Sequence, residues 1–159
     1  MYSDAIIIGE VELPLAGVNA WQHFVIEADH YDDWPDALSS GGIETTGVAQ
    51  ALNTLHRLEG SPGGPFLDLE YEDDRLTIRG FLQESEFARW GELIASVTRA
   101  AGEVGGVGQL IVADAHTSHG TLMVINRSEV DFEEQVDEPM SDTGYGRVAQ
   151  SILTRGGIA

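Results

Sequence analysis

Apolar and polar residues alternate with a period of two along several stretches of the chain, and this alternation predicts β-strands. The first stretch begins with β-branched residues and ends at Pro14, which cannot continue a strand ladder. A later pair of stretches meets at Asp73-Asp74, residues that suit a two-residue hairpin turn. The predicted strands are 5–13, 66–72, 75–82, 109–115 and 121–127, with an edge strand over 129–138. The segment 21–28 fits either a strand or a helix, and its β-branched residues favour a strand.

Helical spacing of three and four residues appears in two places. Apolar residues recur at this spacing between Thr46 and Leu58, and Gly60 follows as a stop. A longer helix is expected to be capped by Ser85, with one apolar stripe made of Phe87, Trp90, Ile94, Val97, Ala101 and Val104. A short C-terminal helix is expected near 145–154. Because consecutive strands read as hairpins, we predict one α+β domain over 1–159, a mainly antiparallel sheet with two principal helices on one face.

Length and composition narrow the class of protein. The chain has 159 residues, of which 42% are hydrophobic, so it has enough apolar surface for one folded domain and is unlike a disordered acidic tail. It contains no cysteine and no apolar run of the roughly 18 residues that a membrane span needs. The N-terminal residues Met-Tyr-Ser-Asp lack a basic region, so we expect no secretory signal and a cytoplasmic location.

Charge is the feature that bears most on function. The chain contains 27 acidic residues and eight basic ones, all arginine, which gives a formal net charge of −19. The solubility of a small domain needs a net charge of only about two to eight units. The additional negative charges repel one another in the folded state and lower its stability. We therefore expect a basic macromolecular partner, since nucleic acid and anionic membranes would be repelled. The alternative is an organism whose proteins are acidic throughout, in which case the charge identifies no partner.

Two acidic segments are candidate partner-binding surfaces. In 27–36, carboxylates can meet a partner's arginine and lysine while two aromatic residues serve as anchors. The candidates there are Asp29, Tyr31, Asp32, Asp33, Trp34 and Asp36. The alternatives are a plain loop whose Trp34 packs inward, or a chelating or acid–base site, although the EF-hand pattern is absent. In 129–138, recognition competes with simple protection of a sheet edge, and the candidates are Asp131, Glu133, Glu134, Asp137 and Glu138.

A histidine-containing turn is the only other cluster with possible chemistry. Asp114, His116 and His119 can supply imidazole and carboxylate ligands to a metal, and the competing interpretation is a polar hairpin loop. No phosphate-binding loop, dinucleotide fingerprint or nucleophile elbow is present. We therefore predict a protein that is not an enzyme and has no cofactor.

The segment 75–142 combines a hairpin, a helix carrying Trp90-Gly-Glu-Leu-Ile, a glycine-containing turn into Gln109-Leu-Ile-Val-Ala-Asp, and Leu122-Met-Val-Ile-Asn. This pattern resembles the small cytoplasmic immunity proteins of bacterial polymorphic-toxin and contact-dependent systems. The resemblance implies a protein without enzymatic activity that binds a cognate toxin and blocks its active site or substrate groove. The hairpin departs from the family, because His116 and His119 stand where mainly acidic residues are expected.

The sequence thus predicts an immunity or inhibitor protein that neutralises a basic toxin domain, with a nuclease as the first candidate. One alternative is a metal-binding protein or hydrolase that uses Asp114, His116 and His119. A second alternative is an acidic protein that mimics DNA or belongs to a phage.

Overall fold

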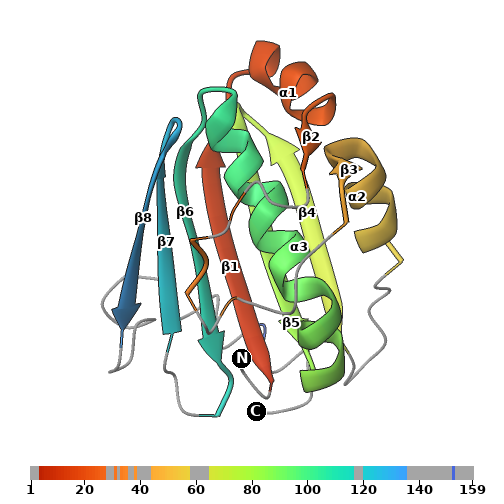
Figure 1. The fold of residues 1–159 in the computed structure, drawn as a ribbon, viewed down its shortest axis with the longest axis vertical. Coiled ribbons are helices and arrows are strands. Elements are labelled where there is room, and N and C mark those ends of the chain that lie inside the picture. Colours follow the sequence, from red (N-terminus) through yellow and green to blue (C-terminus); the bar gives the residue numbers. More distant parts are fainter. Residues whose placement is uncertain are drawn as a thin grey trace.

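A six-stranded antiparallel sheet forms the centre of the molecule (Figure 1). The computed structural model describes residues 4–27, 31, 33–35, 38, 44–57, 65–116, 120–135 and 152. The strands lie in the order β4-β5-β1-β6-β7-β8, and each neighbouring pair is antiparallel. Their bounds are β1 Ala5–Glu12, β4 Phe66–Glu72, β5 Arg75–Leu82, β6 Val107–Asp114, β7 Gly120–Asn126 and β8 Glu129–Gln135. The predicted α+β class with a mainly antiparallel sheet is confirmed.

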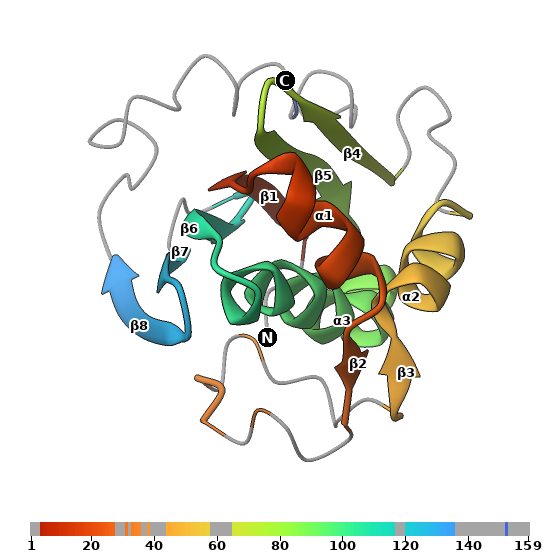
Figure 2. The ribbon, with the colours of Figure 1, turned by 90° about the horizontal axis from the view of Figure 1, so that it is seen from above.

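Strand β1 is one of the two central strands, and its N-terminal half is buried on both faces. Ala5, Ile7 and Val11 face the larger core cluster, whereas Ile6 and Ile8 face a smaller cluster on the opposite side. Both β5 and β6 run antiparallel to β1, so they are parallel to each other with β1 between them. The connection from β5 to β6 is helix α3, Glu84–Glu103, which crosses one face of the sheet (Figure 2).

Helix α3 buries the apolar stripe that the sequence predicts, but Ser85 does not cap it. Gln83 occupies the N-cap position, and the Ser85 hydroxyl donates a hydrogen bond to the Glu86 carboxylate at 2.8 Å. The helix starts earlier because a carboxylate oxygen of Asp4 accepts the Glu84 backbone N–H at 3.3 Å. Asp4, a residue distant in sequence, therefore accepts one of the N–H groups that have no partner within the first turn of the helix.

The strand predicted over 21–28 is wrong for its first residues. Trp21 and Gln22 are the last two residues of helix α1, Leu15–Gln22, and only Val25–Ile26 pairs as a strand, β2. The Trp21 side chain is buried, and its indole N–H donates to the carbonyl oxygen of Val97 in α3 at 2.9 Å. This contact between distant segments holds a helix that the local pattern does not predict.

The remaining elements lie beside α3. Helix α2, Val48–Leu55, falls within the helix predicted after Thr46, and strand β3, Thr46–Gly47, pairs with β2. The predicted C-terminal helix lies outside the described residues except for Ile152, which is helical and buried against the smaller core cluster. None of the described helices is long and apolar enough to cross a membrane.

Candidate functional site: an acidic face of the sheet

Strand alternation gathers carboxylates on the sheet face opposite α3. Ile6 and Ile8 lie on this face, so Glu10 and Glu12 on the same strand lie there too. The strand register carries the same face across the sheet to β4 and β8. We call it the acidic sheet face, and its described carboxylates are Glu10, Glu12, Asp68, Glu70, Glu72, Glu129, Asp131 and Glu133.

The acidic sheet face is apolar at one end and open at the other. At the apolar end, Phe66, Phe81, Ile111 and Leu122 are buried together with Ile152. At the open end lie two hollows of about 500 and 380 Å³, which share Glu12 and Val107. We call the pair the acidic groove, and its lining includes Glu10, Glu12, Asp73, Asp74, Arg75, Val107, Gln109, Val124 and Asn126.

The acidic groove already contains one guanidinium, which shows how its carboxylates receive a cation. Nη1 of Arg75 lies 2.8 Å from Glu10 Oε1, and Nη2 lies 3.7 Å from Glu12 Oε1. These side chains are 50%, 35% and 71% exposed, respectively, so the ion pairs are surface pairs of small net worth. Val107 is 41% exposed beside them and offers an apolar surface to the stem of an arginine or lysine.

Strand β8 extends the acidic sheet face to the edge of the sheet. Glu129, Asp131 and Glu133 are exposed, whereas Val130 and Phe132 point to the other face and pack against the larger core cluster. The predicted edge strand with one apolar face is therefore confirmed over 129–135. The side chain of Glu134, and Asp137 and Glu138 altogether, lie outside the described residues.

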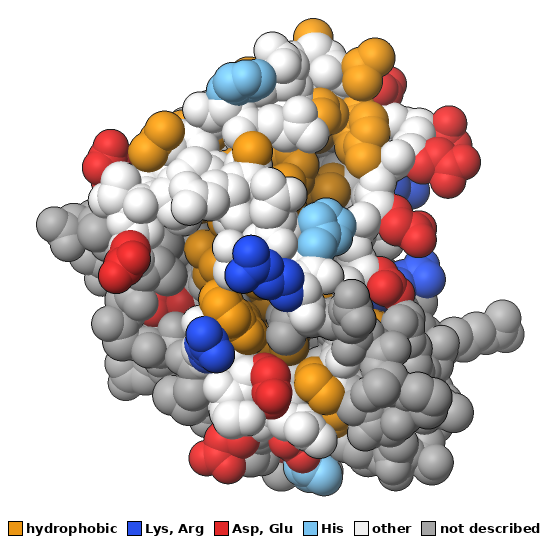
Figure 3. All heavy atoms as spheres, turned by 90° about the vertical axis from the view of Figure 1, so that its right-hand side faces the viewer, with side chains coloured by type: hydrophobic (Ala, Val, Ile, Leu, Met, Phe, Trp, Pro, Cys, Tyr) orange, Lys and Arg blue, Asp and Glu red, His pale blue; other side chains and the backbone are white. Residues whose placement is uncertain are grey.

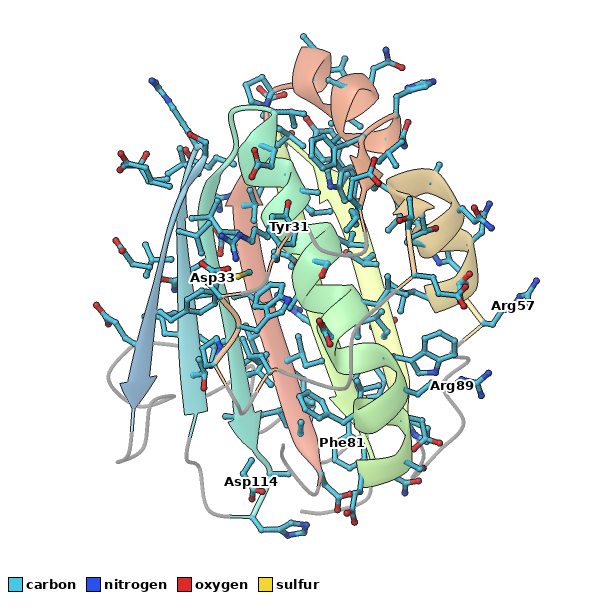
Figure 4. All side chains as sticks on the ribbon, viewed as in Figure 1. Tyr31, Asp33, Arg57, Phe81, Arg89 and Asp114 are labelled. Atoms are coloured by element: carbon cyan, nitrogen blue, oxygen red, sulfur yellow. The ribbon has the colours of Figure 1, made fainter. Side chains whose placement is uncertain are left out.

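The first acidic segment behaves differently, because its described residues turn toward α3 (Figure 4). Arg99 of α3 forms a two-point ion pair with Asp33, Nη1 to Oδ1 at 2.7 Å and Nη2 to Oδ2 at 3.2 Å. The Arg99 guanidinium also lies 4.2 Å from the ring centre of Tyr31 and 5.3 Å from that of Trp34. The Trp34 ring contacts Phe132 edge to face, with the ring centres 5.6 Å apart.

This packing changes the interpretation of Tyr31 and Trp34. Tyr31 is 6% exposed and Trp34 packs against the core, so neither is an exposed anchor; the inward-packed loop describes them better. Hydrogen bonds from Arg99 hold the pKa of Asp33 below its ordinary value, and burial raises that of Tyr31. Asp29, Asp32 and Asp36 lie outside the described residues.

Arg99 is the residue that sequence reasoning missed. A signal for it exists, since it is an arginine between small helical residues, Ser96 and Ala100, where a loop can pack closely. Its side chain is 12% exposed, and a cation so buried needs a carboxylate partner. Nothing in the pattern indicates which of the many carboxylates that partner is.

The described residues of the predicted histidine site form two separate contacts. The Asp114 carboxylate accepts the backbone N–H of His116 at 2.8 Å, and His116 Nε2 lies 2.9 Å from Asp4 Oδ2. Within the described part of the chain, no three histidine, cysteine or acidic residues are grouped so that they could hold a metal ion. His119 lies outside that part.

Comparison of the chain with protein-family models, with curated proteins and with solved structures finds no match.

Proposed function

We propose that this protein is a binding module that neutralises a basic protein by covering its functional surface, as an immunity or inhibitor protein covers a toxin domain such as a nuclease. The observation that carries the proposal is the acidic sheet face with its open groove. Eight described carboxylates from strands β1, β4 and β8 lie on this one face of the sheet. A nuclease surface shaped for phosphates presents the complementary charge.

Recognition would combine steering with local contacts. The net charge of −19 attracts a cationic surface from a distance and raises the association rate, an effect that salt screens. At contact, a partner's arginine or lysine would place its stem over Val107 and its charge beside Glu12. Because the Arg75 ion pairs are exposed, an incoming guanidinium can replace Arg75 at small cost.

The test uses the protein encoded next to this chain in its genome as the candidate toxin. Association is followed by stopped flow, with the Debye length changed from about 30 Å at 0.01 M salt to about 3 Å at 1 M. The test variant combines Glu12→Gln, Glu70→Gln and Asp131→Asn, which removes three exposed carboxylates from the acidic sheet face. We expect association at low salt to slow about tenfold and the salt dependence to weaken.

The control variant removes the same charge elsewhere. It combines Glu44→Gln, Glu84→Gln and Glu103→Gln, three exposed residues outside the acidic sheet face. We expect it to keep an association rate within about twofold of the unmodified protein. Equal slowing by both variants would mean that only total charge matters, and an association rate that ignores ionic strength would refute the proposal.

A further inference from the structure

A second concave region lies between α2 and the N-terminal half of α3, and its chemistry is the opposite of the acidic groove. Two hollows of about 430 and 300 Å³ share Thr54, Arg89 and Trp90. We call them together the arginine groove. The larger hollow is completed by Arg57, Ser85 and Glu86, the smaller by Glu44, Thr46, Gln50, Ala51 and Leu93. On this side of the molecule, Figure 3 shows basic side chains flanking exposed hydrophobic surface.

Two exposed arginines, Arg57 and Arg89, line the larger hollow. Arg75 and Arg99 form ion pairs, whereas Arg57 and Arg89 form none with any described residue. Figure 4 places Arg57 and Arg89 on the same side of the molecule, one beyond the end of α2 and the other on α3. In a chain with 27 acidic residues, two guanidiniums that form no ion pair among the described residues line one hollow and give it a local positive charge.

The groups between these arginines are mainly hydrogen-bond donors. The guanidinium carbon of Arg89 lies over the Trp90 ring, 4.6 Å from its centre, in a cation–π contact. The Trp90 side chain lines both hollows. Among the described residues that line the larger hollow, Glu86 is the one carboxylate, and it accepts the Ser85 hydroxyl. Guanidinium and indole N–H groups suit an oxyanion, because they donate and do not accept.

The smaller hollow adds an apolar surface and determines which way round a ligand would bind. Ala51, Leu93 and the Trp90 ring line it, and Glu44 lies there too and would repel an anion. A negatively charged group is therefore favoured in the larger hollow beside Arg57, and an uncharged body in the smaller one. Each volume reaches the size of a small-molecule site, about 300 to 1,000 Å³.

We propose that the arginine groove binds a small ligand that carries a phosphate or carboxylate on an aromatic or other apolar body. The oxyanion lies between Arg57 and Arg89, and the body packs against Trp90 and Leu93. This inference is independent of the proposed function, because the arginine groove lies between helices and not on the acidic sheet face.

The test is a titration of ¹⁵N-labelled protein followed at the indole N–H of Trp90 and the Nε–H groups of the arginines. Phenyl phosphate and benzoate are the two anionic probes, and their relative affinity distinguishes a phosphate from a carboxylate ligand. Phenol and inorganic phosphate each supply only half of the proposed ligand. We expect saturable shifts at Trp90 and Arg89 with at least one anionic probe, and weaker binding of both half-probes.

Substitutions then assign the effect to the arginine groove. Arg57→Gln and Arg89→Gln are each expected to weaken the better probe about tenfold. Arg79→Gln removes the same charge from an exposed residue of β5 and should leave the affinity unchanged. The inference is overturned if neither anion gives a saturable shift, if phenol or inorganic phosphate binds as tightly, or if Arg79→Gln weakens binding as much as Arg89→Gln.

Discussion

The ion pair between Arg99 and Asp33 should stabilise the fold in an asymmetric way, because its two members differ in burial. The side chain of Arg99 is 12% exposed, whereas that of Asp33 is 53% exposed. Replacing Asp33 by asparagine leaves a nearly buried guanidinium without a counter-charge. Replacing Arg99 by methionine removes that charge and returns a half-exposed carboxylate to water. The loss of stability caused by Asp33→Asn should therefore depend on the presence of Arg99.

The expected magnitudes follow from this burial. Removing one member costs about 0.2–1 kcal/mol for exposed pairs and about 3–5 kcal/mol for buried pairs. With one member buried and the other half exposed, we expect Asp33→Asn to cost about 2 kcal/mol. Arg99→Met loses stacking on Tyr31 and Trp34, at roughly 0.5–1 kcal/mol for each contact, offset in part by the apolar side chain. With Arg99 already replaced, Asp33→Asn should cost less than about 0.5 kcal/mol.

Urea unfolding of the four proteins of this double-mutant cycle measures the coupling directly. The slope of the free energy of unfolding against urea concentration should be the same for all four proteins, so that differences in the unfolding midpoint report stability alone. We expect a coupling free energy of about 1.5 kcal/mol. A coupling below about 0.5 kcal/mol would refute the view that Arg99 anchors the loop through Asp33.

The same pair predicts a pH dependence whose sign can be worked out. Arg99 lowers the pKa of Asp33 in the folded protein below its ordinary value of 3.8. Between the two values the unfolded chain binds more protons, so the free energy of unfolding rises with pH there. The contribution is complete above the ordinary value and is lost as pH falls through the folded value. The stability difference between the unmodified protein and Asp33→Asn should therefore shrink below about pH 4, and a constant difference would contradict this assignment.

Two further predictions concern packing and alkaline pH. Gly102→Ala should destabilise by about 1–3 kcal/mol, because the added methyl would contact Ile125 and lie 2.6 Å from the backbone oxygen of Arg127. Gly47→Ala meets open space and serves as the control in thermal unfolding; equal stability of the two variants would show that the close approach at Gly102 costs nothing. Burial raises the pKa of Tyr31 above its ordinary value of 10.0, so stability should fall as pH rises past that value, where only the unfolded chain ionises. Tyr31→Phe should reduce this fall in urea unfolding above pH 10, and an unchanged fall would assign it to other groups.

The sequence predicts the local elements well where short-range chemistry decides them. The hairpin of β4 and β5 has the predicted bounds, and Asp73 and Asp74 both adopt the positive φ angles, 53° and 60°, that a tight two-residue turn requires. Helix α1 was missed because Leu15–Gln22 contains glycine, valine and asparagine, and the helix depends on the Trp21 contact with α3. The cap at Ser85 failed for the same kind of reason, since Asp4 supplies the acceptor from another part of the chain.

The candidate sites show the same division. Alternation along β8 indicates that Asp131 and Glu133 share a face, and they do. It does not indicate that Glu10 and Glu70 lie on that same face, because strand order is decided by pairing between distant segments. The arginine groove was likewise invisible, because Arg57 and Arg89 become neighbours only when α2 packs beside α3.

By itself, the sequence determined the six strands of the large sheet, two of the helices, the alternation of charge along each strand and the excess of negative charge, since all of these depend on composition or on residues a few positions apart. Only the tertiary structure decided which carboxylates are free to meet a partner. Asp33 and Asp131 occupy similarly acidic segments, yet Asp33 is held by an arginine 66 residues away while Asp131 is exposed at the sheet edge. Coulomb attraction at close range depends on distance in space, and folding alone sets that distance.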